Sequence, residues 1–218
     1  MTDAVLLLSG GIDSTVVLAE LRAADRNPLC LVFDYGQTLV NEVEVARLNA
    51  ARYQAECSII KFPMNGLLRN CALTAGAYQG AARLPVNRTP EQISAAGTPP
   101  SYVPFRNGIF LAIAAAVAED RGIGKIYCGG NGLSSGNYPD DTAAFAAKMQ
   151  EAINEGTGPA WNCQVVFPNA MMSKAGVVKK ARRLGVDLAA TWSCYFNLEK
   201  HCGICDSCVQ RQSAGAPL

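Results

Sequence analysis

The sequence contains little of several residue types that particular functions require. Charged residues make up 17% of its 218 residues, against about 25% in an average soluble domain. The 19 basic and 18 acidic residues leave a net charge of +1, with no block of lysine and arginine. An affinity built mainly on nucleic-acid phosphates is therefore not expected. Histidine occurs once, at position 201, so a histidine-based nucleophile mechanism has a single candidate base.

Long apolar runs are also missing. No run approaches the roughly 20 residues needed to span a bilayer, although 50% of the residues are apolar. The first four residues, MTDA, lack the positive charge that opens a signal peptide. We therefore expect a cytoplasmic protein without a membrane span. At roughly 150 residues per domain, the length fits one domain with a small appendage, and it is sufficient for a sizeable core.

Short apolar runs and segments with helical spacing alternate along the chain. The runs are typical of strands buried on both faces of a parallel sheet, and they cover residues 4–8, 30–33, 58–60, 125–128 and 164–167. Helical spacing is found at about residues 14–24, 39–53, 109–119, 141–154 and 173–184. This order predicts an α/β fold, a doubly wound, mostly parallel five-stranded sheet with helices on both faces. Ligands of such sheets bind at the carboxyl ends of the strands.

Two regions interrupt this alternation. Periodicity fails between Pro63 and Pro100, and a loop of that length inside a compact domain is often a lid. We predict a long loop or lid over residues 63–104, either above the active site or at a dimer contact. The last 27 residues also lack a clear period, but they contain a cluster of cysteines. We expect them to form a small segment beside the main domain.

The first apolar run leads into the motif SGGIDS at residues 9–14. Two glycines let the backbone turn sharply and approach a ligand, and the helix that follows directs N–H groups and partial positive charge at the same space. An oxyanion fits there. The motif has no lysine and is not GxGxxG, which argues against γ-phosphoryl transfer. The alternative is an ordinary turn in which Asp13 or Ser14 caps the helix.

The nine cysteines fall into two groups. Their odd number, in a core-rich chain without a signal peptide, argues against a disulfide scaffold. Five are scattered singly and are interpreted as small core hydrophobes. The other four have the spacing C-x7-C-x2-C-x2-C, which lets thiolates surround one tetrahedral centre; they are Cys194, Cys202, Cys205 and Cys208. Structural zinc is the leading interpretation, and an iron–sulfur cluster or redox disulfides are alternatives. His201 is interpreted as a neighbour of this site rather than a ligand.

The loop motif resembles the pyrophosphate loop of the adenine-nucleotide α-hydrolase superfamily, which includes GMP, NAD and asparagine synthetases and tRNA-thiolating enzymes. The resemblance implies that ATP with Mg²⁺ is cleaved between its α and β phosphates to adenylate an oxygen, which ammonia or sulfur then displaces. It implies an ATP-binding domain over residues 1–190 and a zinc-binding segment over residues 191–218. The implied nucleotide-binding residues are Leu8, Ser9, Gly10, Gly11, Ile12, Asp13, Ser14, Thr15, Asp34, Tyr35 and Gly36.

Four further motifs narrow the resemblance to the 7-cyano-7-deazaguanine synthase family of the queuosine pathway. They are FDYGQ at 33–37, YVPFRN at 102–107, SGNYPD at 135–140, and CY at 194–195 with the trailing C-x2-C-x2-C. The family implies adenylation of the carboxylate of 7-carboxy-7-deazaguanine, displacement by ammonia to an amide, and a second adenylation that yields the nitrile. It also implies zinc on the four cysteines and a homodimer. No glutaminase domain fits within this length, so free ammonia or an ammonia-supplying partner is expected.

Within this resemblance, catalytic roles are predicted for Asp13, Arg106 and Lys174. The two cations lie near predicted element boundaries and suit the neutralisation of developing phosphate charge, although each is also compatible with an ordinary surface charge. Asp13 or Asp34 is a candidate for holding Mg²⁺, which prefers carboxylate, water and phosphate oxygens. The predicted substrate-binding residues are Arg106, Asn107, Tyr138 and Asp140.

The sequence departs from the family pattern where a base-recognition loop is expected. Asn137 separates the SG and YPD parts of the third motif, residues 132–134 contain no acid, and residues 141–144, directly after Asp140, contain no arginine. Two alternatives therefore stay open. One is a divergent paralogue that stops at the amide or joins a deazaguanine acid to another amine. The other is an RNA-modifying, thiolating enzyme with the same loop.

Overall fold

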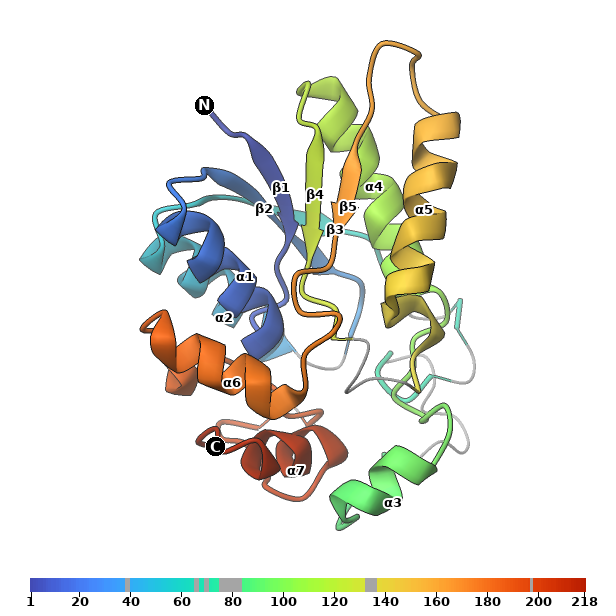
Figure 1. The fold of residues 1–218 in the computed structure, drawn as a ribbon. Coiled ribbons are helices and arrows are strands. Elements are labelled where there is room, and N and C mark those ends of the chain that lie inside the picture. Colours follow the sequence, from blue (N-terminus) through green and yellow to red (C-terminus); the bar gives the residue numbers. More distant parts are fainter. Residues whose placement is uncertain (38–39, 65–66, 69–70, 75–83, 132–136, 197) are drawn as a thin grey trace.

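The computed structural model describes residues 1–218 except 38–39, 65–66, 69–70, 75–83, 132–136 and 197. Its described strands form one all-parallel sheet of five, in the order β3-β2-β1-β4-β5 (Figure 1). The strands are β1 (Ala4–Leu7), β2 (Pro28–Asp34), β3 (Glu56–Lys61), β4 (Lys125–Cys128) and β5 (Gln164–Val166). The predicted fold class is confirmed, and every strand pair in the described sheet is parallel.

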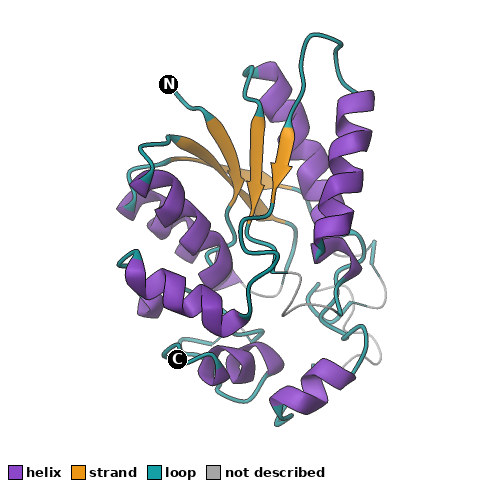
Figure 2. Ribbon diagram, viewed as in Figure 1, coloured by secondary structure: helices purple, strands orange, loops and turns teal. Residues whose placement is uncertain are grey.

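Helices cover both faces of this sheet (Figure 2). The five that the sequence pattern predicted are α1 (Ile12–Ala23), α2 (Val40–Arg52), α4 (Arg106–Asp120), α5 (Ala143–Glu155) and α6 (Lys174–Arg183). Two more were not predicted, α3 (Pro90–Ala95) and α7 (Asp206–Ser213), along with short 3-10 turns at Pro139–Asp141 and Leu188–Ala190. Both missed helices are too short for a periodic pattern to stand out. No helix in the described part of the chain is long and apolar enough to cross a membrane.

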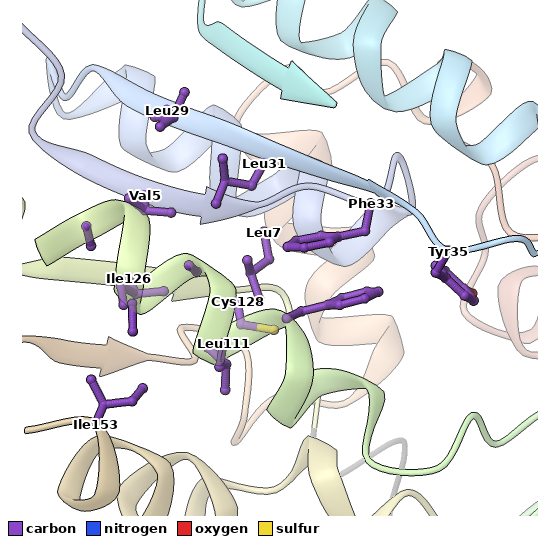
Figure 3. Packing of buried hydrophobic residues seen from close by; sticks show 14 of the residues in the cluster. Val5, Leu7, Leu29, Leu31, Phe33, Tyr35, Leu111, Ile126, Cys128 and Ile153 are labelled. Atoms are coloured by element: carbon purple, nitrogen blue, oxygen red, sulfur yellow. The ribbon is translucent and has the colours of Figure 1, made fainter. Parts of the chain in front are cut away.

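The alternating side chains of the two central strands build two separate cores. Val5 and Leu7 of β1 point to the same face as Leu29, Leu31 and Phe33 of β2, where they pack with α4 and α5 (Figure 3). Their sequence neighbours point to the opposite face and pack against α1 and α2. Burial on both faces explains why these strands are continuous apolar runs rather than alternating ones.

The strand order reverses at β1. Its two neighbours are β2, which follows it in sequence, and β4, which follows only after α4. The chain therefore leaves β1 toward one edge of the sheet and leaves β4 toward the other edge. A crevice forms between these two connections at the carboxyl ends of the strands, and sheets of this kind bind their ligands at such a switch point. The SGGIDS loop lies at this point, between β1 and α1.

One part of the predicted 63–104 loop, residues 84–95, contacts the C-terminal segment. Val86 forms an isolated antiparallel bridge with Cys205, and Arg88 makes a two-pronged ion pair with the largely buried Asp206 at the start of α7. The helix α3 lies within this region, and its Thr89 forms a capping box with Gln92. These contacts tie residues 84–95 to the cysteine cluster.

Candidate functional site

One cleft of about 290 Å³ lies at the carboxyl ends of the central strands. It brings together residues that are far apart in sequence and that were predicted to bind nucleotide or substrate. Those lining it are Leu8, Ser9, Gly11, Ile12, Asp13, Ser14, Tyr35, Arg106, Asn107, Tyr138, Asp140 and Lys174. Four predicted residues lie outside the described lining: Gly10, Thr15, Asp34 and Gly36.

The serine side chains of the loop between β1 and α1 accept hydrogen bonds from the backbone of the same loop. The backbone N–H of Ser9 donates to Ser14 Oγ at 3.2 Å, and that of Gly11 donates to Ser9 Oγ at 3.3 Å. The N-cap of α1 is Gly11, with no side-chain cap, so capping by Asp13 or Ser14 does not occur. The first N–H groups of this 12-residue helix are therefore available to an anion in the cleft.

Glycines allow two close backbone approaches at this loop. Gly10 has φ +75°, and a Cβ there would lie 2.8 Å from the backbone nitrogen of Ala46 in α2. Gly129, which follows β4, lies so close to the start of α1 that a Cβ would be 2.6 Å from the backbone nitrogen of Ser14. Both positions require glycine because the added atom would meet backbone rather than a side chain that could move.

Asp13 is paired with Lys174 across the cleft. The ammonium group of Lys174, at the start of α6, forms an ion pair with Asp13 Oδ2, and about a quarter of each side chain remains exposed. The fully buried Asn169 donates to the carbonyl oxygen of Asp13 at 3.2 Å and accepts from Lys180 at 3.3 Å. Lys180 also pairs with Glu20 of α1 at 2.7 Å. This network fixes α6 to α1 and orients the loop.

Arg106 is the first residue of α4 and points toward the end of β2. Its Nη1 donates to the hydroxyl of Tyr35 at 3.1 Å, and its guanidinium lies 5.9 Å from the ring centre of Phe110. Burial lowers the pKa of Arg106, but Tyr35 and Glu42 raise it above its ordinary value. Burial likewise raises the pKa of Tyr35 to about 12, despite the opposing effect of Arg106. Arg106 is therefore a permanent cation on one wall of the cleft.

Glu42, which no sequence motif singled out, lines the cleft from the first turn of α2. Burial raises its pKa to about 7, and the nearby Arg106 lowers it by less. Its only sequence signal is its place in the first turn of the helix that follows the FDYGQ motif. Burial in the tertiary structure makes this carboxyl unusual, and Arg106, which is 64 positions further along the numbering, opposes that effect.

The predicted substrate-binding residues line the cleft, and one of them, Asp140, also holds the start of α4. Its Oδ2 accepts from the backbone N–H of Asn107 at 2.9 Å, and its carbonyl oxygen accepts from the Asn107 side chain at 2.9 Å. Phe105, the N-cap of α4, offers no side-chain cap, so Asp140 supplies the missing acceptor. Ser135 and Gly136 of the same sequence motif lie outside the described residues.

A chain of hydroxyl groups joins the cleft to the cysteine segment. The Ser101 and Tyr138 hydroxyl oxygens are 2.8 Å apart, and those of Tyr138 and Tyr195 are 3.2 Å apart. All three residues line the cleft. Burial raises the pKa of Tyr195 well above its ordinary value, so this phenol stays neutral. Ser101 was not predicted, and Tyr195 was quoted only as part of a motif.

The four clustered cysteines form a site that fits a tetrahedral metal. Their sulfur atoms all lie within 4.8 Å of one another. Cys202 Sγ and Cys208 Sγ are 3.8 Å apart, which is the separation of about 3.8 Å that metal–sulfur bonds near 2.3 Å give in a tetrahedron. Backbone N–H groups donate to the sulfurs, including that of Cys205 to Cys202 Sγ at 3.3 Å. These donors favour thiolates, the form that binds metal.

His201 is not among the metal-site residues of the described chain. Its Nε2 accepts a hydrogen bond from the backbone N–H of Ser193 at 3.1 Å, and its ring packs on Trp192 with centroids 4.6 Å apart. These contacts place His201 beside the cysteine cluster, and its interpretation as a neighbour rather than a ligand stays a prediction.

A fully buried arginine fastens the cysteine segment to the main domain. Arg211 of α7 donates to the hydroxyl oxygens of Thr191 and Ser193, at 2.9 and 3.0 Å, and to the carbonyl oxygens of Leu188 and Pro217. Burial lowers its pKa, and the nearby Cys208 opposes this effect. All four acceptors are uncharged oxygens, and Cys208 is the nearby group whose charge favours the guanidinium cation.

Residues 3–216 match the family model described as queuosine biosynthesis protein QueC. The chain belongs to this family. It is 37% identical over 218 residues to the 7-cyano-7-deazaguanine synthase of Nitratiruptor sp., covering 98% of this chain and 95% of that protein. It is 37% identical over 215 residues to the enzyme of that name from Picrophilus torridus, covering 97% and 86%.

A structural comparison finds the U34-tRNA thiolase NcsA of Methanococcus maripaludis, which was solved with a [4Fe-4S] cluster. It is 16% identical, with a TM-score of 0.48, and the match covers 99% of this chain and 65% of that one.

Proposed function

We propose that this protein is an ATP-dependent carbon–nitrogen ligase that forms 7-cyano-7-deazaguanine from 7-carboxy-7-deazaguanine and ammonia. The observation that carries this proposal is the cleft itself. The uncapped start of α1 and the two cations Arg106 and Lys174 meet there, in a chain that matches its family from residue 3 to residue 216.

In the proposed reaction, a carboxylate oxygen of the substrate attacks the α-phosphorus of ATP and pyrophosphate leaves. The N–H groups and serines of residues 9–14 hold the pyrophosphate, because they present donors and a helix dipole to an oxyanion. Lys174 and Arg106 neutralise the charge that develops on the phosphate oxygens. Asp13 lines the cleft and would hold Mg²⁺. Asp34 does not line it, and its carboxylate accepts from the Gly36 N–H at 3.5 Å.

Ammonia then attacks the acyl carbon of the adenylate, and AMP leaves to give the amide. A second ATP adenylates the amide oxygen, and loss of AMP and of the remaining nitrogen-bound protons gives the nitrile. The phosphate loop, Lys174 and Arg106 would act in the same way in both adenylations, so one cleft serves both. We place the substrate beside Arg106, Asn107, Tyr138 and Asp140.

Zinc is the metal we assign to Cys194, Cys202, Cys205 and Cys208. Four thiolates leave no open coordination position, so the metal would cross-link the segment rather than take part in the reaction. Metal analysis of protein purified without oxygen tests this assignment. One zinc per chain is the expected result. Iron together with visible absorbance would overturn the zinc assignment in favour of an iron–sulfur cluster.

The activity is tested by incubating the protein with ATP, Mg²⁺, ammonium and 7-carboxy-7-deazaguanine, followed by mass spectrometry. We expect AMP, pyrophosphate and the nitrile. Release of ADP would exclude the adenylation mechanism, whereas an amide as the final product would keep the mechanism and change the product. Omission of ammonium, with other amines added in turn, tests conjugation to a different acceptor.

The supply of ammonia, the assembly and the location belong to the same proposal. We propose a cytoplasmic homodimer that uses free ammonia or ammonia from a partner protein. Light scattering on the purified protein tests the dimer, and a measured mass of 23 kDa would exclude it.

A further inference from the structure

Four acidic side chains line the cleft in the described part of the chain, and three of them are engaged. Asp13 pairs with Lys174, Asp140 accepts from the Asn107 N–H, and Asp141 accepts from the Asn131 N–H at 3.4 Å. Glu42 is the fourth. Its carboxylate forms no hydrogen bond or ion pair with the residues that the structure describes. It is therefore an acid in the cleft whose oxygens are not committed to holding the fold.

The charged surroundings of Glu42 come from two neighbouring elements. Arg106, at the start of α4, is the cation that acts on it, and the Tyr35 hydroxyl, after β2, is the other titratable group nearby. On α2 itself, Glu44 and Arg47 pair with each other on the exposed side of the helix. Partial burial raises the pKa of Glu42 to about 7, against the effect of Arg106. A carboxyl of this kind takes up and releases a proton at neutral pH.

The proposed reaction needs such a group. When ammonia adds to the acyl-adenylate, the new nitrogen carries a positive charge and must lose a proton for the amide to form. When the adenylated amide becomes a nitrile, nitrogen loses its remaining protons as the carbon–oxygen bond to AMP breaks. Lys174 is already paired with Asp13. His201 does not line the cleft, and its Nε2 accepts from the Ser193 N–H.

We propose that the Glu42 carboxylate is the general base that removes these protons from nitrogen. This inference rests on the proposed function. In the first round, the nitrogen–carbon bond forms, Glu42 takes one proton from nitrogen, the carbon–oxygen bond breaks and AMP leaves with its electron pair. The protonated Glu42 then releases its proton to solvent, and the same group serves the dehydration. Arg106 stays protonated throughout, and its positive charge balances the negative charge on the phosphate of AMP and on the substrate oxygens.

The test compares Glu42→Gln with Glu44→Gln, which changes an acid two positions along the same helix on its exposed face. Two partial reactions are measured. Exchange of labelled pyrophosphate into ATP, dependent on 7-carboxy-7-deazaguanine, reports adenylation alone. Amide formation in a single turnover, at a fixed concentration of free ammonia, reports the nitrogen step. We expect Glu42→Gln to keep exchange within about threefold and to lose amide formation by about 100-fold or more. Glu44→Gln should retain both.

Hydroxylamine provides a second readout. Its adduct loses a proton more readily than that of ammonia, so it needs less help from a base. Glu42→Gln should therefore recover most of its rate when hydroxylamine replaces ammonia, which a merely misfolded cleft would not do. The rate of the wild-type amide step should also rise with pH through an apparent pKa near 7, and this limb should disappear in the variant.

The outcomes separate the two proposals. If the wild-type protein shows no exchange with the carboxylate, the proposed function fails before Glu42 is tested. If the wild type is active and Glu42→Gln forms amide within threefold of it, the base assignment is overturned. A raised KM for the carboxylate with an unchanged maximal rate would overturn it too, because Glu42 would then be a binding group.

Discussion

The backbone N–H of Trp192 donates a 3.0 Å hydrogen bond to the carbonyl oxygen of Gly10. This bond joins the C-terminal segment to the phosphate loop, and Trp192 itself lines the cleft, two positions before Cys194. Arg211 holds the same stretch from the other side through Thr191 and Ser193. The cysteine site therefore supports the wall of the cleft, although its sulfur atoms take no part in the proposed reaction.

Cys205→Ser should lower metal content, melting temperature and activity together. The serine oxygen is a poorer metal ligand than a thiolate, and a weakly held segment would leave Gly10 without its Trp192 partner. Metal analysis and thermal unfolding check this, with Cys57→Ser as a control because Cys57 lies on β3, away from the cluster. A variant that keeps a full metal complement would contradict the ligand set.

Asp13→Ala should abolish adenylation with little effect on folding. The Asp13–Lys174 pair is partly exposed, and such pairs contribute at most about 1 kcal/mol to stability. Loss of the carboxylate that would hold Mg²⁺ and that pairs with Lys174 misplaces the cations that stabilise the phosphates, which costs about 100-fold or more in rate. Pyrophosphate exchange and urea unfolding measure the two effects. The control is Asp3→Ala, which removes a more exposed ion-pair partner from Arg26 outside the cleft. Unchanged AMP release by Asp13→Ala would refute the role of Asp13.

Gly129→Ala should damage the phosphate loop. Its Cβ would lie 2.6 Å from the backbone nitrogen of Ser14, so the start of α1 must move, at a cost of about 1–3 kcal/mol. The expected result is a higher KM for ATP and lower stability. Gly124→Ala is the matched control because its nearest contact would be an ordinary 3.5 Å. If the two variants had the same KM for ATP and the same stability, the start of α1 would be able to move aside without a loss of stability.

Glu42→Gln should make stability less dependent on pH. The pKa of Glu42 rises from 4.5 to about 7 on folding, so between these values the folded state binds more protons than the unfolded state. The contribution of Glu42 to the free energy of unfolding is therefore fully present below pH 4.5, where the carboxyl is protonated in both states. It is lost as the pH rises through about 7, because the folded state must then bury a charged carboxylate. The variant should melt at least about 2 °C higher than wild type at pH 8 and show no such gain at pH 4.5. A constant difference between the two pH values would contradict the shift.

Local sequence patterns were sufficient to predict several parts of this protein. The apolar runs predicted the sheet because strands buried on both faces need continuous apolar residues. The loop motif and the spacing of Cys202, Cys205 and Cys208 were visible because turns and metal knuckles are built from neighbouring residues. The four-cysteine cluster able to hold a metal is present as expected. The roles assigned to individual cleft residues stay predictions.

Other features depend on contacts between distant residues, which no local pattern records. Glu42 is an ordinary surface-type acid in the sequence, and only its burial in the folded chain raises its pKa, against the opposing effect of Arg106. Asp140 was predicted to bind substrate, but the fold also uses it to hold the start of α4. Likewise, Trp192 donates to the distant Gly10, and the buried Arg211 donates to the residues on either side of Trp192, Thr191 and Ser193. The sequence by itself determined the phosphate loop and the four-cysteine cluster, because each is built from residues that are neighbours in the chain. Only the tertiary structure decided the raised pKa of Glu42 and the position of Trp192 beside Gly10, because burial and packing between distant segments produce them.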